Sequence, residues 1–295
     1  MKSSRSRFLE LRGLRYHVRE WGDESAPKLF LLHGWMDVSA SFQFTVDAFA
    51  QDWHVIAPDW RGFGLSQWAS AGYWFPDYIG DLDVLLDQLS PGEPARVLGH
   101  SMGGNVAGLY AGIRPERISQ LILAEGFGLP RTVPEQAPGR YLKWLDANRE
   151  TPVLRPYASF DEVAARLKAN TPGLGDERAR FLAVHWAEEK APGRIELRAD
   201  PRHKMPNPVL YRVEEAMACW RKISAPTLWI FSGGDWLQRF MKGDEQTLAA
   251  YRATYRQLSE CRIDGASHMM HHDQPERFAR AIEAFLLNDS TGKKS

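Results

Sequence analysis

The sequence predicts an α/β protein in which helices cover both faces of a mostly parallel sheet. Three observations lead to this prediction. Short apolar runs, several of them rich in β-branched residues, alternate along the chain with longer helical stretches. One such run passes through a glycine-flanked serine at 99–103 directly into a helical stretch. Residues 129–223 break the alternation, which indicates a segment inserted into the sheet domain.

The first two strands are expected at 8–11 and 14–21, where polar and apolar residues alternate as in an antiparallel pair joined through Gly13. From residue 28 onward the expected strands are compact apolar runs, which are typical of buried parallel strands. These runs are 28–32, 53–57, 95–98, 118–124 and 227–231, and a last strand is expected near 256–263. Helices are expected between and after them at 42–50, 78–89, 103–113 and 275–287.

Residues 1–128 and 224–295 are expected to form the core domain, and residues 129–223 a helical cap inserted into it. The inserted segment is rich in proline and has amphipathic stretches at 137–148, 160–170 and 178–189. It begins after the 118–124 run, at the carboxyl end of a strand, where open α/β sheets bind ligands. Trp144, Trp186 and Tyr211 are therefore candidates for contact with a substrate, although aromatic residues at such spacing also form the core of a cap.

The composition argues against several classes of function. Lys plus Arg and Asp plus Glu both number 37, so the formal net charge is zero and neither nucleic acid nor a membrane surface is indicated as a partner. We expect a small-molecule substrate and a monomer or homodimer. The two cysteines, Cys219 and Cys261, provide neither a disulfide framework nor the spacing of a metal site, so no metal is expected. With no signal peptide or long apolar segment evident, a cytoplasmic location is expected.

Gly99-His100-Ser101-Met102-Gly103 carries most of the functional prediction. It follows the apolar run 95–98 and precedes a helical run of small residues at 104–113. A G-x-S-x-G turn between a strand and a helix presents its serine on strained backbone, and glycines at the flanking positions let the two elements pass closely. Ser101 is therefore the candidate nucleophile.

A serine nucleophile needs a base to accept its proton. In G-x-S-x-G enzymes the order along the chain is serine, acid, histidine. His268 follows the last expected strand and is the candidate base. His271 and His272 lie closer to the start of the last helix, where a capping or solvated role is more natural.

Two carboxylates compete for the role of the acid that orients this histidine. Asp235 follows the run 227–231 through Ser232-Gly233-Gly234, a turn that can direct a carboxylate back toward the imidazole. Glu125 ends the preceding strand and could reach the same histidine. The sequence favours Asp235 and leaves Glu125 as the alternative.

Acyl transfer also requires backbone N–H groups that bind the oxyanion of the transition state. Met102 follows the nucleophile and is expected to provide one of them. The loop after the run 28–32 contains His33-Gly34-Trp35, in which glycine leaves room for a close backbone approach. Trp35 is the candidate for the second donor, although this segment could also be a simple turn.

These residues resemble the α/β-hydrolase fold enzymes over about residues 29–122 and 225–287. The motifs that carry the resemblance are Leu31-Leu32-His33-Gly34-Trp35, the loop 58–66, the serine turn 99–104, Pro226-Thr227-Leu228 and Gly265-Ala266-Ser267-His268. The resemblance implies an eight-stranded sheet, a helical cap, a Ser-Asp-His triad and no cofactor. The cap distantly resembles that of the serine hydrolase-like subgroup.

The expected function is that of a serine carboxylesterase acting on a small to medium apolar ester. Dehalogenases and epoxide hydrolases of the family have an aspartate at the position of Ser101, so their chemistry is not expected here. Hydrolysis of a carbon-carbon, amide or thioester bond by the same triad stays open. A binding protein that has kept the fold and lost the chemistry is an alternative from another class.

Overall fold

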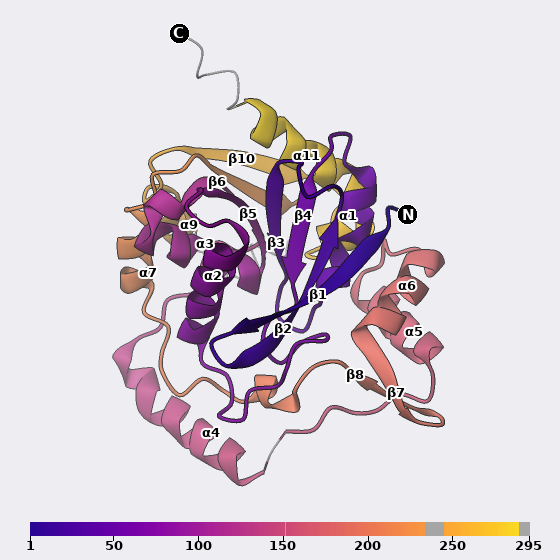
Figure 1. Cartoon of the computed structure of the whole chain (residues 1–295). Helices are drawn as coiled ribbons and strands as arrows, with labels where there is room; N and C mark the ends of the chain where they lie inside the picture. Colours follow the sequence, from indigo (N-terminus) through magenta and orange to yellow (C-terminus); the bar gives the residue numbers. More distant parts are fainter. Residues whose placement is uncertain (151, 234–244, 289–295) are drawn as a thin grey trace.

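The computed structural model describes residues 1–150, 152–233 and 245–288. Its main element is an eight-stranded sheet with the strand order β1-β2-β4-β3-β5-β6-β9-β10 (Figure 1). The strands are β1 (Ser4–Leu11), β2 (Leu14–Trp21), β3 (Lys28–Leu32), β4 (His54–Pro58), β5 (Ala95–His100), β6 (Ile118–Ala124), β9 (Thr227–Ser232) and β10 (Leu258–Ile263). β2 pairs antiparallel with β1 and β4, whereas all the other pairs are parallel. The predicted mostly parallel, eight-stranded sheet is confirmed.

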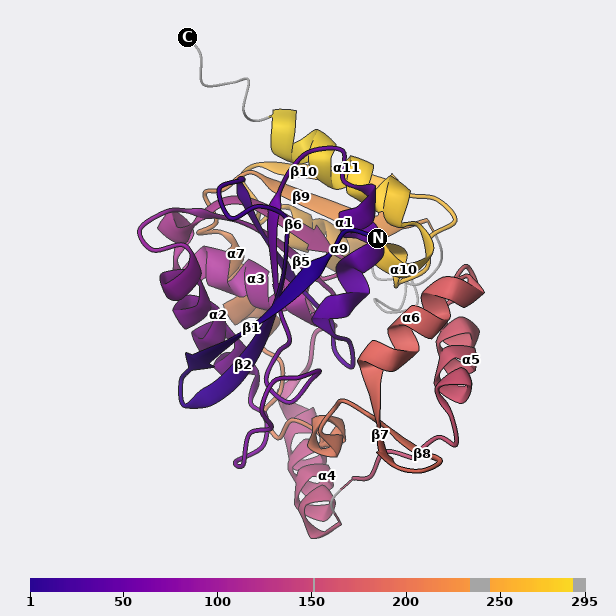
Figure 2. The same cartoon turned by 45° about the vertical axis from the view of Figure 1, so that its right-hand side comes forward.

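Two hydrophobic cores lie on opposite faces of this sheet because neighbouring side chains along a strand point to opposite sides. In β6, Leu121 and Leu123 belong to one core, whereas Ile122 and Ala124 belong to the other. The first core is completed by α2 (Phe75–Leu89), α3 (Met102–Ile113), α7 (Val213–Trp220) and α9 (Glu245–Arg252). The second is completed by α1 (Gln43–Ala48), α10 (Met270–Asp273) and α11 (Pro275–Asn288), which lie together in Figure 2.

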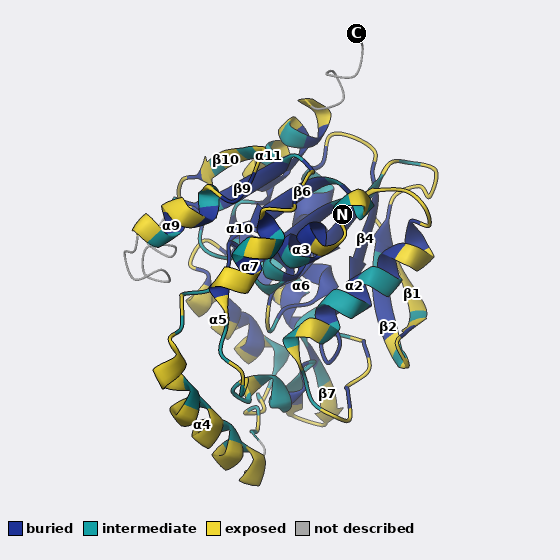
Figure 3. Cartoon of the chain, turned by 90° about the vertical axis from the view of Figure 1, so that its left-hand side faces the viewer, coloured by how far each residue is buried: buried dark blue, intermediate teal, exposed yellow. Residues whose placement is uncertain are grey.

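The predicted inserted segment contains most of the elements that lie away from the sheet. These are η3 (Pro134–Gln136), α4 (Ala137–Arg149), α5 (Phe160–Asn170), α6 (Asp176–Trp186), β7 (Ala187–Ala191), β8 (Arg194–Leu197) and η4 (Pro201–Lys204). α5, α6 and the β7–β8 hairpin form a third small core together with Phe44 of α1. α4 has no buried residue and stands apart from the sheet, as Figure 3 shows.

Two features of this segment differ from the sequence expectation. The helix expected over 178–189 ends at Trp186, and the chain continues into the β7–β8 hairpin, whose turn contains Gly193 at a φ of 71°. Pro192 and Gly193 are a turn signal that the helical pattern before them obscured. In addition, α7 packs against α3 of the core, where the indole of Trp220 lies beside Gly108.

The short 3-10 helices η1 (Ser39–Phe42) and η2 (Pro115–Arg117) complete the described elements. No helix in the described ranges is long and apolar enough to cross a membrane.

A buried ion pair joins α2 to the loop after β4. Asp81 is fully buried and accepts two hydrogen bonds of 2.6 Å from the guanidinium of Arg61, with further bonds from Arg12 and the hydroxyl of Tyr16. Removing one partner of a buried pair leaves the other charge without compensation.

We expect Asp81→Asn to lower the free energy of unfolding by about 3 to 5 kcal/mol, because Arg61 would keep its buried charge, lose its fully buried carboxylate partner and retain only the partly exposed Asp77 as a counterion. Urea denaturation followed by circular dichroism measures the change. Asp176→Asn is the control, since Asp176 pairs with Lys168 at the protein surface and should change stability far less. Equal losses in the two variants would contradict the prediction.

Candidate active site

Ser101 lies at the junction between β5 and α3, two residues from glycine on either side. Its backbone has a φ of 51° and a ψ of −115°, which is strained for a residue with a side chain. A Cβ atom on Gly99 would lie 2.3 Å from the carbonyl oxygen of Gly103, and one on Gly103 would lie 2.2 Å from that of Leu32. Both positions therefore require glycine if strand, turn and helix are to pack this closely.

His268 lies in the loop between β10 and α10, with its imidazole directed at Ser101. Its Nε2 is 3.2 Å from the Oγ of Ser101, within hydrogen-bond reach of the hydroxyl. The Nε2 of His100 donates a 2.8 Å hydrogen bond to the backbone carbonyl of His268 and so holds this loop against the end of β5. The structure thus brings together the serine and the histidine that the sequence proposed as nucleophile and base.

His271 and His272, the rival histidines, lie in α10, and neither ring forms a hydrogen bond with Ser101. Both are fully buried rather than solvated, and this burial, together with the neighbouring histidines, lowers the pKa of each to about 3. His271 donates from Nε2 to Asp37 at 3.1 Å. Neither ring is therefore placed to accept the proton of Ser101.

Glu125 is the carboxylate that the described residues bring to His268. It follows β6 at a positive φ of 53° and is buried. Its Oε2 lies 3.7 Å from the Nδ1 of His268, and its Oε1 accepts a hydrogen bond from the backbone N–H of Ser232. Asp235, the acid that the sequence favours, lies outside the described residues, so both candidates for this role stay open.

The two candidate oxyanion donors flank Ser101. Met102 is the first residue of α3, and the first N–H groups of a helix have no partner within it. A Cβ atom on Gly34 would lie 3.2 Å from that of Ser101, so the loop after β3 approaches the nucleophile closely just before Trp35. An anion formed at Ser101 would lie at a helix N-terminus, where the helix dipole is favourable.

A cleft of about 920 Å³ adjoins this site. Trp35, Met102 and Trp144 of α4 all lie in its lining. Trp186 is placed elsewhere, because its indole donates a hydrogen bond to Ser41. Tyr211 lies in a separate depression beside Tyr141. These three substrate contacts stay predictions, although only Trp144 reaches the cleft.

The loop before α2 forms much of the cleft wall and was not singled out from the sequence. Tyr73, Trp74 and Phe75 lie in the lining. Three consecutive aromatic residues at the start of a helix are the sequence signal that could have identified it.

We expect Ser101→Gly to be more stable than Ser101→Ala by roughly 1 kcal/mol, because glycine adopts the positive φ without strain and alanine does not. Both variants should lose catalysis. Thermal unfolding of the two variants side by side measures the difference. A more stable alanine variant would show that the turn stores no strain at this residue.

Comparisons with known proteins agree with this fold. A family model described as alpha/beta hydrolase fold matches residues 27–275. A serine hydrolase-like protein of Danio rerio is 26% identical over 294 residues, covering 95% of this chain and 86% of the relative. A thioesterase domain from the curacin biosynthetic pathway superimposes with a TM-score of 0.85 at 24% identity, covering 96% of this chain and 99% of that one.

A second solved structure, a novel esterase from Mycobacterium tuberculosis, has a TM-score of 0.70 at 20% identity and covers 97% of this chain and 92% of its own. At such identities the two structures show the shared fold alone. The family model, in contrast, covers most of the sequence and both halves of the sheet. The chain therefore belongs to the alpha/beta hydrolase fold family.

Proposed function

We propose that this protein is a serine carboxylesterase that cleaves small to medium apolar esters through an acyl-enzyme. The observation that carries the proposal is the 3.2 Å contact between Ser101 Oγ and His268 Nε2 at a strained turn beside a cleft. Hydrolase activity is also what the family and its esterase members indicate.

In the proposed reaction His268 takes the proton of Ser101 while Oγ attacks the ester carbonyl carbon. The N–H groups of Trp35 and Met102 bind the resulting oxyanion. The intermediate collapses with cleavage of the ester C–O bond, and His268 returns the proton to the leaving alcohol. Water then gives a proton to His268 and attacks the acyl group, which releases the acid and restores the hydroxyl of Ser101.

A thioester is the second candidate substrate, and the size of the cleft favours it. About 920 Å³ accommodates a leaving group larger than a simple alcohol. One structural neighbour is named as a thioesterase domain. Matched oxygen and sulfur esters with the same acyl chain separate the two candidates, because the ratio of their kcat/KM values, divided by the ratio of their uncatalysed hydrolysis rates, reports the leaving-group preference of the enzyme.

We expect the wild-type protein to form a single covalent adduct with a small fluorophosphonate, because an activated serine attacks phosphorus as it attacks an acyl carbon. Ser101→Ala should form none and should lose ester turnover with its fold intact. Intact mass and circular dichroism provide the two measurements. A wild-type protein that is folded and stays unlabelled would favour the non-catalytic binding protein.

The acid is identified by a set of three variants, Glu125→Gln, Asp235→Asn and the double variant. If Asp235 orients His268, Asp235→Asn should lower kcat by orders of magnitude, and Glu125→Gln should have a smaller effect. If Glu125 is the acid, the ranking is reversed. A double variant no worse than the more damaging single variant would show that only one carboxylate acts, whereas a further loss would show that each can replace the other.

A further inference from the structure

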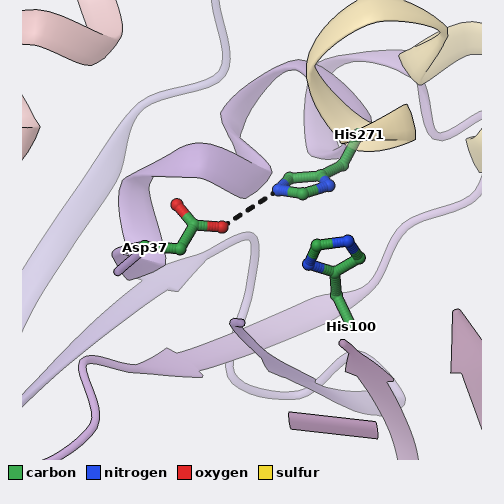
Figure 4. Close-up of side chains that lie close together, drawn as sticks. All are labelled: Asp37, His100 and His271. Carbon is green, nitrogen blue, oxygen red and sulfur yellow. Dashed lines mark hydrogen bonds and ion pairs between the residues drawn. The ribbon is translucent and has the colours of Figure 1, made fainter. Parts of the chain in front are cut away.

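Asp37, His100 and His271 form a buried cluster next to the candidate active site. Asp37 lies in the loop after β3, His100 ends β5, and His271 belongs to α10 (Figure 4). Each is at most 1% exposed, and one possible ligand atom from each lies within 4.8 Å of the other two. Among the described residues this is the one group of three or more such side chains with that spacing.

Two ligand atoms of the cluster already have the separation that one metal ion requires. The Oδ2 of Asp37 and the Nε2 of His271 are 3.1 Å apart. Nitrogen and oxygen ligands lie about 2.1 Å from zinc, so two of them at nearly a right angle are about 3 Å apart. An ion could therefore replace the proton that this pair shares, with little movement of either side chain.

His100 offers an available third ligand. Its Nε2 must carry a proton, because it donates to the carbonyl of His268 at 2.8 Å. In the neutral ring Nδ1 then has a free lone pair. That nitrogen is buried and hydrogen-bonds to no described residue, which is unusual for a polar atom in a protein interior.

The cluster also contains the buried carboxylate of Asp37, which has few hydrogen-bond and ion-pair partners. The Oδ1 of Asp37 accepts from the backbone N–H of Val38 at 2.8 Å and from the hydroxyl of Ser41. Its Oδ2 faces His271, and no lysine or arginine in the described residues forms an ion pair with it. A divalent cation would compensate this carboxylate, and two imidazoles with one carboxylate are a common ligand set for zinc and its neighbours.

We propose that Asp37, His100 and His271 bind a divalent first-row transition metal ion such as Zn²⁺, and that the bound ion inhibits the hydrolase. Ligand atoms in tetrahedral coordination lie about 3.4 Å apart, whereas the ligand atoms of this cluster are separated by up to 4.8 Å. The His100 ring must therefore move toward Asp37 and His271 when the ion binds. His100 precedes Ser101 and holds the loop of His268, so its movement displaces both reacting groups. The inhibition rests on the proposed function, whereas the binding site does not.

The test measures binding and reactivity separately. Calorimetry with Zn²⁺ and the visible absorption of the Co²⁺ form report occupancy and a nitrogen-oxygen ligand set. The rate of fluorophosphonate labelling, with and without Zn²⁺, reports the state of Ser101. The variants are Asp37→Asn and His271→Gln, with His272→Gln as the control, because His272 is equally buried in the same helix and outside the cluster. Circular dichroism confirms that each variant is folded.

We expect one Zn²⁺ per chain, slower labelling when it is bound, and recovery on addition of a chelator. His271→Gln should lower the affinity for Zn²⁺ by at least about tenfold, because the loss of a partner that only supports a ligand already lowers metal affinity by about that factor. His272→Gln should leave the affinity unchanged. If Asp37→Asn fails to fold, His271→Gln alone tests whether the cluster binds the ion. Absence of stoichiometric binding would overturn the proposal.

Unchanged affinity in His271→Gln would also overturn it, since the ion would then sit elsewhere, for example on His268. Binding that leaves the labelling rate unchanged would refute the inhibition alone. A protein that is never labelled but still binds Zn²⁺ through His271 would instead refute the proposed esterase and retain the metal site.

Discussion

The strained turn at Ser101 is the constraint on which the rest of the site depends. The turn joins a central parallel strand to a helix within a single residue, and it closes only because Gly99 and Gly103 leave no side chain between them. Gly34 adds a milder constraint in the loop after the neighbouring strand, where an added Cβ atom would lie 3.2 Å from that of Ser101. The close packing that strains the nucleophile also brings the candidate oxyanion donors to it.

The sheet topology explains how residues so distant in sequence meet. β3, β5, β6, β9 and β10 are parallel, so their carboxyl ends lie at one edge of the sheet. Trp35 follows β3, Ser101 follows β5, Glu125 follows β6 and His268 follows β10. A loop after any strand of this series can therefore place an acid near His268, and sequence order alone does not select between Glu125 and Asp235.

The parts of the structure that were predictable from the sequence are those with a local cause. The bounds of β3 and β6 coincide with the expected strands because each is a buried apolar run between clear turn signals. The cluster around Asp37 was not predicted, because its members come from three separate segments and none has a local motif. The cleft wall at 73–75 was missed for a related reason, since aromatic residues in a loop do not reveal whether they face a core or a cavity.

The two parts of the cap are joined to the core very differently. The part containing α5 and α6 shares a small core with Phe44 of α1. It is also joined to the sheet domain by the ion pair between Arg178 and Glu276 and by the bond from Trp186 to Ser41, which in turn donates to Asp37. α4 buries none of its residues and yet provides Trp144 to the cleft. A helix of 13 residues gains most of its stability from packing, so a ligand filling the cleft would stabilise α4 as well as bind to it. Trp144 thus reaches the cleft from a helix with little packing of its own, whereas the candidate catalytic residues Ser101 and His268 follow strands of the packed sheet.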